Sequence, residues 1–285
     1  MNILEAHRRL TSHLEKKGLE SPRVTSEILI SHTLGIPRIQ IYARHERSLA
    51  EKDLDGLREL SKRIAAGEPL QLVVGNTQFF GRAFAVRRGV FIPRPETETL
   101  VEVVVDSARN RLAGAPEIRI ADIGTGTGVV AITLLLEIKP AAATATDIDP
   151  AAAALARENA AALGAGERIT VLEGDLFQPL GGGLFDCVVS NPPYVRRGDI
   201  PKLDGVVRDY DPAAALDGGE DGLDFVRAIA KGAADRLKSG GLLAMELGIG
   251  QAEAAKGIFR ENGYESIEAK RDLQGVERVI TGWKR

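Results

Sequence analysis

The hydrophobic residues of this chain follow two different spacings along its length. Through about residue 68 they recur three or four positions apart, as at Leu54, Leu57 and Leu60. Apolar residues at this spacing lie on one face of an α-helix. Residues 1–68 are therefore predicted to form a small helical bundle, and a bundle appended to a larger domain commonly helps to dock a substrate.

The next stretch, residues 69–95, is predicted to be extended. Its apolar residues form short runs around Gly75 and Gly81. Pro93 and Pro95 then end the pattern rigidly, because proline fixes φ and has no backbone N–H. The pattern predicts a β-hairpin that links the bundle to the rest of the chain. The apolar runs expected in it are 72–74, 79–80, 84–86 and 90–92.

Residues 96–285 alternate strand-like with helix-like segments. Apolar runs such as 118–123 and 184–189 have the length of a buried strand, and amphipathic segments such as 96–112 separate them. This alternation is typical of an α/β sheet domain. Residues 195–220 show neither spacing, and a connection of this length in a compact domain is usually either functional or disordered. We expect it to form a flap over the substrate.

Composition narrows the class of protein without identifying it. Hydrophobic residues make up 44% and charged residues 27% of the 285, and the formal net charge is −3. No apolar run approaches the roughly 18 residues of a membrane helix, and no basic excess suggests direct nucleic-acid binding. Cys187 is the only cysteine, which excludes a disulfide framework. With charged residues in place of a signal peptide at the start, we expect a cytoplasmic protein.

All four histidines lie near the start of the chain, the last of them at His45. The predicted α/β domain therefore contains no histidine and one cysteine. Structural and catalytic zinc sites are built mainly from these two residue types. We accordingly expect no metal site and no histidine that acts as a nucleophile or general base.

Two consecutive prolines mark the first candidate site. Pro192 and Pro193 must end the strand predicted over 184–189, which leaves a rigid loop rich in acceptors at a strand's carboxyl end. The side-chain carbonyl of Asn191 and the backbone carbonyl of Pro192 can accept the two hydrogens of a planar –NH2 group, and Tyr194 can stack on it. On these residues alone, an amide or amine site and a plain turn after a strand fit equally well.

A glycine-rich turn adds a second part of the site. It follows the strand-like run 118–123 and precedes a helix-like run. Its glycines allow a tight turn and close approach of a ligand. Asp147 follows about 20 residues later, where nucleoside-binding α/β folds place a carboxylate against a ribose. The spacing G-x-G-x-G disfavours a nicotinamide-dependent oxidoreductase, whose fingerprint is G-x-G-x-x-G. The turn residues expected at the ligand are Gly124, Thr125, Gly126, Thr127 and Gly128.

Together these motifs resemble those of a known family. The chain is similar to S-adenosylmethionine-dependent methyltransferases of the seven-stranded class, and within that class it resembles the release factor glutamine methyltransferases of the PrmC/HemK family. The proline loop alone is shared with amine methylases acting on DNA, RNA and other proteins, whereas its combination with the run Ile92–Glu98 is more specific. The matching motifs are Pro69–Gln71 with Gly75, Phe91–Glu98, Asp122–Gly128, Asn191–Tyr194, Ala215–Gly219 with Asp221 and Gly222, and Glu277–Val279.

The resemblance implies a fold and a reaction. The fold is α/β: a seven-stranded Rossmann-like class I methyltransferase domain at 96–285 with an antiparallel last strand, a linking β-hairpin at 69–95 and a helical docking domain at 1–68. The reaction transfers a methyl group from S-adenosylmethionine, leaving S-adenosylhomocysteine. Its acceptor is the side-chain amide nitrogen of the glutamine in the Gly-Gly-Gln motif of class 1 peptide chain release factors, so that translation termination is modulated.

The resemblance also implies roles for individual residues. Asp175 would face the adenine, and the position of Leu176 is often aromatic in the family, so that packing on adenine is kept here but stacking is lost. The implied catalytic residues are Asn191, Pro192 and Tyr194. The implied donor site consists of Gly124–Gly128, Asp147, Asp175, Leu176 and Asn191. The implied substrate site consists of Asn191, Pro192, Pro193, Tyr194, Phe91, Arg94 and Pro95.

Other functions remain open from the sequence. A glutamine of a ribosomal protein would suit the same loop, and so would an exocyclic amine of DNA or RNA, because adenine also presents –NH2 on a flat edge. The first 68 residues contain twelve Lys and Arg against ten Asp and Glu, a net charge of +2, which argues against nucleic acid. An intact transfer site disfavours a non-catalytic donor-binding module. Glu246 ends another predicted strand at the same edge, where a functional role and a structural pairing are both open.

Overall fold

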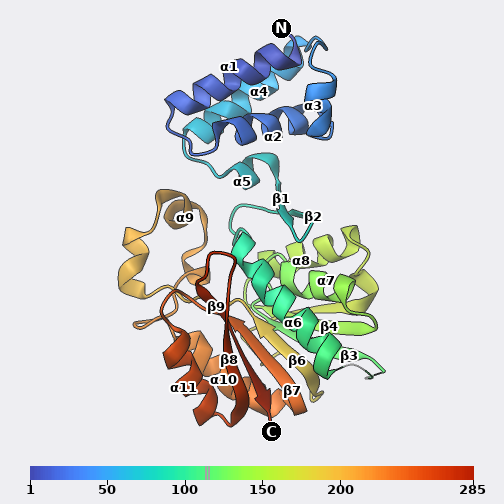
Figure 1. Cartoon of the computed structure of the whole chain (residues 1–285), viewed down its shortest axis with the longest axis vertical. Helices are drawn as coiled ribbons and strands as arrows, with labels where there is room; N and C mark the ends of the chain where they lie inside the picture. The colour runs from blue at the N-terminus through green and yellow to red at the C-terminus, as the bar shows by residue number, and fades with distance from the viewer. Residues whose placement is uncertain (113, 115) are drawn as a thin grey trace. The chain divides into compact units, whose positions relative to one another are not determined.

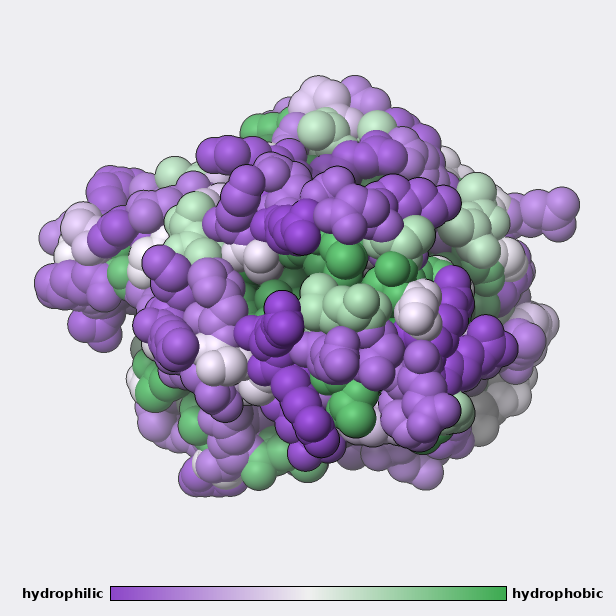
Figure 2. Space-filling view, turned by 90° about the horizontal axis from the view of Figure 1, so that it is seen from above, coloured by the Kyte–Doolittle hydropathy of each residue, from purple (hydrophilic) through white to green (hydrophobic). Residues whose placement is uncertain are grey.

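Two compact units, residues 1–76 and 77–285, make up the chain (Figure 1). The computed structural model describes residues 1–112, 114 and 116–285. None of the helices within these residues is both long enough and apolar enough to cross a membrane. Hydrophilic residues dominate the face of the molecule in Figure 2, with hydrophobic residues visible in smaller groups between them.

The first unit is helical, as its apolar spacing predicts. Its core is built from side chains that recur on one face of each helix, such as Leu10 and Leu14 in α1, Leu29 and Ile30 in α2, and Leu57 in α4. The short α3 has no counterpart in the predicted pattern. The helices are α1 (Ile3–Lys16), α2 (Pro22–Leu34), α3 (Ile39–Ala43), α4 (Glu51–Ala65) and α5 (Leu70–Val74).

The linking hairpin is shorter than the apolar runs predict. Its strands are β1 (Asn76–Phe79) and β2 (Arg82–Ala85). Residues 72–74 belong to helix α5 instead, which ends at Gly75 with a left-handed φ of +74°. Residues 90–92 are not part of a strand either. Both errors concern short apolar runs, whose length and composition do not distinguish a strand from a buried helical turn or loop.

The second unit is built on the predicted seven-stranded sheet. Its strand order is β5-β4-β3-β6-β7-β9-β8, and β9 runs antiparallel to both of its neighbours, as the resemblance implied. The fold class is therefore confirmed. The strands are β3 (Ile118–Ile123), β4 (Ala141–Asp147), β5 (Ile169–Glu173), β6 (Phe185–Ser190), β7 (Leu237–Glu246), β8 (Tyr264–Arg271) and β9 (Glu277–Lys284).

Helices cover both faces of this sheet (Figure 1). Successive strand residues point to opposite faces, so Cys187 and Val189 pack with α6, α7 and α8, while Val188 packs with α10 and α11. A sheet buried on both sides explains why its strands are apolar throughout. The helices are α6 (Glu98–Arg111), α7 (Val129–Glu137), α8 (Pro150–Ala162), α10 (Asp224–Arg236) and α11 (Ala252–Glu261), with short 3-10 turns η1 (Pro95–Thr97) and η2 (Gly166–Arg168).

The strand order reverses between β3 and β6. These two strands pair in parallel, with Ile120 opposite Cys187 and Asp122 opposite Val189. The hydroxyl of Ser190 donates a hydrogen bond of 2.6 Å to the carbonyl of Ile123, which joins the two strand ends. Loops that follow strands at such a reversal diverge and leave a crevice between them, where open α/β sheets bind ligands. The glycine turn and the proline loop are these two loops.

The predicted flap contains short helical turns. It includes η3 (Arg197–Lys202), α9 (Gly205–Tyr210) and η4 (Ala213–Ala215). Its two ends are joined by backbone hydrogen bonds from Val195 N–H to the Leu216 carbonyl (2.9 Å) and from Gly218 N–H to the Val195 carbonyl (2.8 Å). The flap is thus a closed excursion of the chain that starts and ends beside Tyr194.

Asn159 on α8 joins the hairpin to the glycine turn, and its loss should destabilise the second unit. Its amide, in a side chain 2% exposed, accepts from Ala85 N–H (2.8 Å) and donates to the carbonyls of Ala85 (3.1 Å) and Thr127 (2.9 Å). We expect Asn159→Ala to lower the free energy of unfolding by about 3 kcal/mol, because one buried and two partly buried backbone groups lose their partner. Urea denaturation followed by circular dichroism measures this.

The matched control is Asn262→Ala. Asn262 donates to a carbonyl of its own helix, Ile258, at 2.8 Å, so its removal should change stability by less than about 1 kcal/mol. Equal losses in the two variants would contradict the bridging role of Asn159.

Candidate active site

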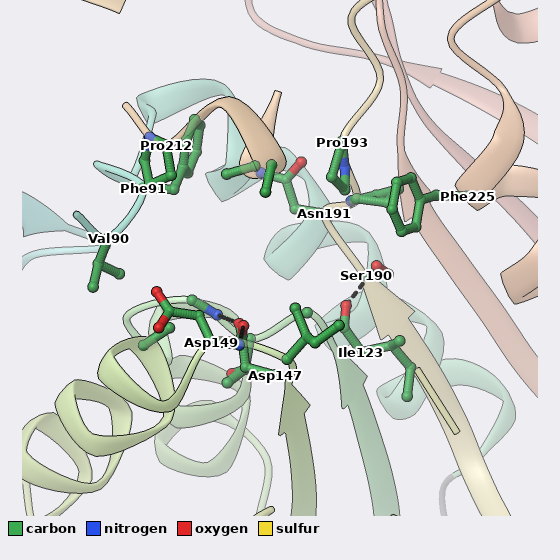
Figure 3. A pocket seen from close by; sticks show the side chains of 18 of the residues that line it. Val90, Phe91, Ile123, Asp147, Asp149, Ser190, Asn191, Pro193, Pro212 and Phe225 are labelled. Carbon is green, nitrogen blue, oxygen red and sulfur yellow. Dashed lines mark hydrogen bonds between the residues drawn. The ribbon is translucent and has the colours of Figure 1, made fainter. Parts of the chain in front are cut away.

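A cavity of about 460 Å³ lies where β3, β4, β5 and β6 end. Figure 3 shows Asp147 and Asp149 on one side of it and Phe91, Asn191 and Pro212 on the other. Its volume is within the range of roughly 300–1,000 Å³ found for small-molecule sites. The residues predicted from the sequence that line it are Phe91, Arg94, Gly124, Thr125, Gly126, Thr127, Asp147, Asp175, Leu176, Asn191, Pro192, Pro193 and Tyr194.

The glycine turn forms one wall through its backbone. Gly124 and Gly126 have φ of +72° and +57°, and a Cβ on either would meet no atom within 4 Å, so the turn presents open space to a ligand. Gly128 differs, because it is not among the lining residues. A Cβ there would come 2.7 Å from Ile132 Cδ1 and 3.2 Å from Ala156 Cβ. Gly128 therefore allows α7 and α8 to pack closely, and only residues 124–127 face the cavity.

Asp147 is held by the backbone around it. Its Oδ2 accepts from Gly126 N–H at 2.7 Å and its Oδ1 from Asp149 N–H at 3.0 Å. Burial raises the pKa of Asp147, while these two hydrogen bonds oppose the rise. A carboxylate oxygen can accept two hydrogen bonds. Both oxygens therefore retain capacity for hydroxyl donors of a ligand, such as a ribose diol.

Asp122 also lines the cavity, although the sequence reasoning gave it no role. The side chain is 1% exposed, and its Oδ2 accepts from the Thr125 hydroxyl (2.7 Å) and from Ala131 N–H (3.2 Å). Burial raises the pKa of Asp122 to about 6, against the effect of these hydrogen bonds. A signal was present, because an acid near the end of the predicted strand lies two residues before the first glycine of the turn. At neutral pH the carboxylate favours a positively charged ligand.

Apolar and acidic groups line the part of the cavity beyond Asp147. Asp175 is exposed, and Leu176 is half-buried with an unusual φ of +46° that is supported by a 2.9 Å hydrogen bond from the Thr146 hydroxyl to its carbonyl. Ile148 was missed from the sequence. It lines the cavity with 67% of its surface exposed, which is uncommon for a large apolar residue beside two acids. Leu176 and Ile148 provide apolar surface for a flat ring.

The side-chain NH2 group of Asn191 is already engaged in a hydrogen bond. Its Nδ2 donates to Thr97 Oγ1 at 3.0 Å, and Thr97 is 1% exposed at the start of α6. The anchor leaves Oδ1 as the unengaged end of the amide. In the described part of the chain, the Pro192 carbonyl accepts no hydrogen bond either. Two adjacent acceptors are thus available at the cavity, and sequence reasoning missed the Thr97 that orients one of them.

Tyr194 is held at both ends. Its backbone carbonyl accepts from Gln251 Nε2 at 2.9 Å, and its hydroxyl donates to Glu246 Oε1 at 3.3 Å. Burial, followed by the charge of Glu246, raises the pKa of the Tyr194 phenol well above its usual value, so that it stays neutral. Gln251 also donates to the Gly222 carbonyl at 3.1 Å and accepts from Gly248 N–H at 2.8 Å. Its role was invisible from the sequence, where it only begins a helix.

Arg94 fastens the flap to the segment before α6. Its guanidinium forms an ion pair with Asp211, whose side chain is fully buried, and lies 5.1 Å from the centre of the Phe91 ring. Ile92 N–H donates to Asp211 Oδ1 at 3.1 Å. Burial raises the pKa of Asp211, and Arg94 counteracts this. Pro95, in contrast, is exposed and is not among the lining residues, so the structure does not bring it into the cavity.

The described residues contain no group of three or more His, Cys, Asp or Glu side chains that could hold a metal ion. The groups that line the cavity suit an organic ligand instead. They are the backbone of a glycine turn, carboxylates at or near strand ends, and apolar surface. The cavity also has two neutral acceptors on a rigid loop. This combination can hold a positively charged nucleoside and present an –NH2 group to it.

Comparisons with known proteins agree with this geometry. The family model described as the PrmC N-terminal domain matches residues 5–75, and the one described as the methyltransferase small domain matches residues 97–203. A release factor glutamine methyltransferase of Geobacter sulfurreducens is 41% identical over 95% of this chain and 92% of its own length. One of Moorella thermoacetica is 40% identical over 100% of this chain and 99% of its own.

Solved structures support the fold at much lower identity. A methyltransferase from Pyrococcus furiosus superimposes with a TM-score of 0.53 at 19% identity, covering 72% of this chain and 90% of its own. The catalytic domain of human Mettl16 in complex with an RNA hairpin gives a TM-score of 0.57 at 17% identity, covering 72% and 76%. At such identities the likeness concerns the fold of the sheet domain alone.

Close packing around Tyr194 should make Gly222 intolerant of any side chain. Gly222 has φ +79°, and a Cβ there would come 2.5 Å from both Gln251 Nε2 and the Tyr194 carbonyl oxygen. We expect Gly222→Ala to destabilise the protein by about 1 kcal/mol because a residue with a Cβ is strained at this φ, which we call the backbone term. Overpacking should add a further ~1–3 kcal/mol. Urea denaturation gives both terms together.

Gly263→Ala separates the two terms. Gly263 has nearly the same φ, +80°, but a Cβ there would meet no atom within 4 Å. This variant should show the backbone term alone. If both variants lose the same stability, the Tyr194 loop is not packed against Gly222 as described.

Proposed function

Since the chain belongs to the family of release factor glutamine methyltransferases, we propose that it methylates the glutamine of the Gly-Gly-Gln motif in class 1 peptide chain release factors. The methyl group goes from S-adenosylmethionine to the side-chain amide nitrogen. The observation that carries the proposal is the pair of unengaged acceptors, Asn191 Oδ1 and the Pro192 carbonyl, on a loop that cannot continue as a strand.

The chemistry of the acceptor explains why this pair matters. An amide nitrogen is a poor nucleophile, because its lone pair is delocalised into the carbonyl. Asn191 and Pro192 can accept its two hydrogens, which orients the nitrogen and stabilises the positive charge that develops on it during transfer. Tyr194 holds the plane of the amide. Alignment of two reactants can remove about 7–11 kcal/mol of a barrier, so positioning can replace a strong general base.

The residues of the cavity fit S-adenosylmethionine. Asp147 offers carboxylate oxygens for the ribose hydroxyls, residues 124–127 offer an open backbone surface, and Ile148 and Leu176 offer apolar surface for the adenine, with Asp175 at its edge. When bound, the donor supplies a methyl group on a positively charged sulfur that is a good leaving group. The buried Asp122 contributes a negative charge toward that end of the cavity.

The remaining parts of the proposal concern the substrate. We assign the helical unit, over residues 1–68 in particular, to docking of the release factor, and the flap at 195–220 to holding the segment around the glutamine. We also assign the protein to the cytoplasm, where methylation of the release factor would modulate translation termination. Mixed charges on the helical unit support a protein partner over a nucleic acid.

Methyl transfer to a release factor is the direct test. A purified, unmodified class 1 release factor incubated with the protein and S-adenosylmethionine should gain one methyl group, which mass spectrometry maps to the Gly-Gly-Gln glutamine. Asn191→Ala should lower the transfer rate by about 10²–10³, the usual effect of removing one group that stabilises developing charge. Donor affinity measured by calorimetry should hardly change.

Asn110→Ala, on the exposed end of α6, is the control and should behave as the original protein. An Asn191→Ala variant that loses donor affinity and rate equally would contradict the acceptor role. If the release factor stays unmodified while donor binding is intact, a ribosomal-protein glutamine and the amines of DNA or RNA become the substrates to test.

Asp147 should control donor affinity. We expect Asp147→Ala to weaken binding of S-adenosylmethionine about 10- to 100-fold, because charge-assisted hydrogen bonds are worth roughly 1.5–3 kcal/mol. Asp147→Asn should give a smaller loss, since its carbonyl still accepts from Gly126 N–H. Isothermal titration calorimetry measures both, with Asp106→Ala on the exposed face of α6 as the control. Unchanged affinity in Asp147→Ala would refute the assignment.

A further inference from the structure

A buried carboxyl group beside the proline loop has no part in the mechanism above. Glu246 ends β7 and is 1% exposed. Its Oε1 accepts the hydroxyl of Tyr194 at 3.3 Å. Its Oε2 is buried without a hydrogen-bond partner among the described residues. An unsatisfied buried carboxylate oxygen is costly, so its retention at this position calls for an explanation.

Strand register explains why Glu246 lies beside the site. β6 and β7 pair in parallel, with Ser190 opposite Met245. The next residues, Asn191 and Glu246, therefore lie side by side at the same edge of the sheet. Asn191 continues into the proline loop, whereas Glu246 stays in the sheet, opposite Val279 of β9. The carboxyl group is thus fixed by a paired strand behind a loop that carries the acceptors.

Thr97 is the group between Asn191 and Glu246. Its hydroxyl oxygen accepts from Asn191 Nδ2 at 3.0 Å, which leaves its own hydrogen to donate. Thr97 is also among the neighbours that lower the pKa of Glu246, which is consistent with its hydroxyl lying close to the carboxyl group. A buried hydroxyl hydrogen and the buried Oε2 therefore complement each other. A Thr97 hydroxyl hydrogen turned toward Oε2 would link the Asn191 amide through Thr97 to the Glu246 carboxyl group.

We propose that Glu246 is the positioning residue of the transfer site, orienting Asn191 through Thr97 and Tyr194 through a direct hydrogen bond. The inference rests on the proposed function and adds the group that sets its geometry. An asparagine amide that lost this anchor could turn its NH2 toward the substrate in place of Oδ1. Two donors would then face each other, and the acceptor pair would be lost.

The charge of Glu246 adds to its orienting effect. A carboxylate at the end of a hydrogen-bonded chain polarises each link, so Thr97 pulls more strongly on the Asn191 amide and Oδ1 becomes a better acceptor. Burial raises the pKa of Glu246 to about 7, while Thr97, Arg278 and Tyr194 lower it and Glu96 raises it further. Arg278 is itself occupied by Asp272 (3.2 Å) and by the Leu247 carbonyl (3.3 Å).

Steady-state kinetics on the full chain with a release factor test the inference. We expect Glu246→Ala to lower kcat about 10- to 100-fold, as for loss of a hydrogen bond to a charged group. KM for the release factor and calorimetric affinity for S-adenosylmethionine should be unchanged. Glu246→Gln, which keeps the shape and one acceptor oxygen, should fall between. Full kcat in Glu246→Ala would overturn the inference, and so would a parallel loss of donor affinity.

Thr97 supplies a test that does not depend on whether the Glu246 variants fold. Thr97→Ser keeps the hydroxyl and should keep kcat, whereas Thr97→Val keeps the shape without it and should lose kcat. Equal values in the two would overturn the inference. In the double variant Thr97→Val/Glu246→Ala the fold-loss of kcat should be smaller than the product of the two single losses, because both substitutions break the same hydrogen-bonded path. Independent losses of kcat that multiply would mean that Thr97 and Glu246 do not act through one hydrogen-bonded path.

Asp272→Asn is the matched control. It alters another buried carboxyl group that holds Arg278 but touches neither Tyr194 nor Thr97, so kcat should stay at the original value. A loss equal to that of Glu246→Ala would assign the effect to Arg278 and overturn the inference. Failure of the original protein to methylate the release factor would count against the proposed function instead. That result comes from the unsubstituted chain, so the two failures are distinguishable.

Discussion

The parallel pairing of β3 with β6 is the constraint on which the rest of the site depends. These strands are 62 or more residues apart in sequence, and their register sets the glycine turn directly beside the proline loop. Because the strand order reverses there, the two loops diverge and leave a cavity between them. The position of the glycine turn on one wall of the cavity and of the proline loop on the other is therefore a consequence of one strand pairing. The Ser190–Ile123 hydrogen bond closes the floor of that cavity.

Carboxyl groups at strand ends give the site its charge. Asp122 is the penultimate residue of β3, and Asp147 and Glu246 end β4 and β7. Burial raises the pKa of each. Burial disfavours the ionised form of these carboxyl groups, and a nearby cation stabilises that form. The proposed donor carries a positive sulfur, and positive charge develops on the acceptor nitrogen. Burying these carboxyl groups costs stability in the free protein. Their attraction to the positive charge of the ligand and of the reacting nitrogen would offset that cost.

Local chemistry made part of this structure predictable from the sequence. Pro192 and Pro193 must end a strand, and Gly124 and Gly126 must allow a tight turn, whatever surrounds them. Contacts between distant segments left no such signal. Thr97 meets Asn191 across 94 residues, and Gln251 meets Tyr194 across 57. The errors at 72–74 and 90–92 have a different cause, since short apolar runs suit several structures and tertiary packing decides among them.

The arrangement as a whole favours positioning over acid–base chemistry. The second unit contains no histidine, its cysteine is buried, and burial keeps the Tyr194 phenol neutral, so none of these groups is a base at neutral pH. What the fold supplies instead is acceptors with fixed directions. The prolines and the hydrogen bond from Gln251 to the Tyr194 carbonyl fix the loop backbone, and Thr97 and Glu246 hold its side chains. A weak nucleophile needs its lone pair directed at the methyl group, and its protons become acidic only as the new bond forms. Acceptors oriented before the reaction meet both needs without a strong base.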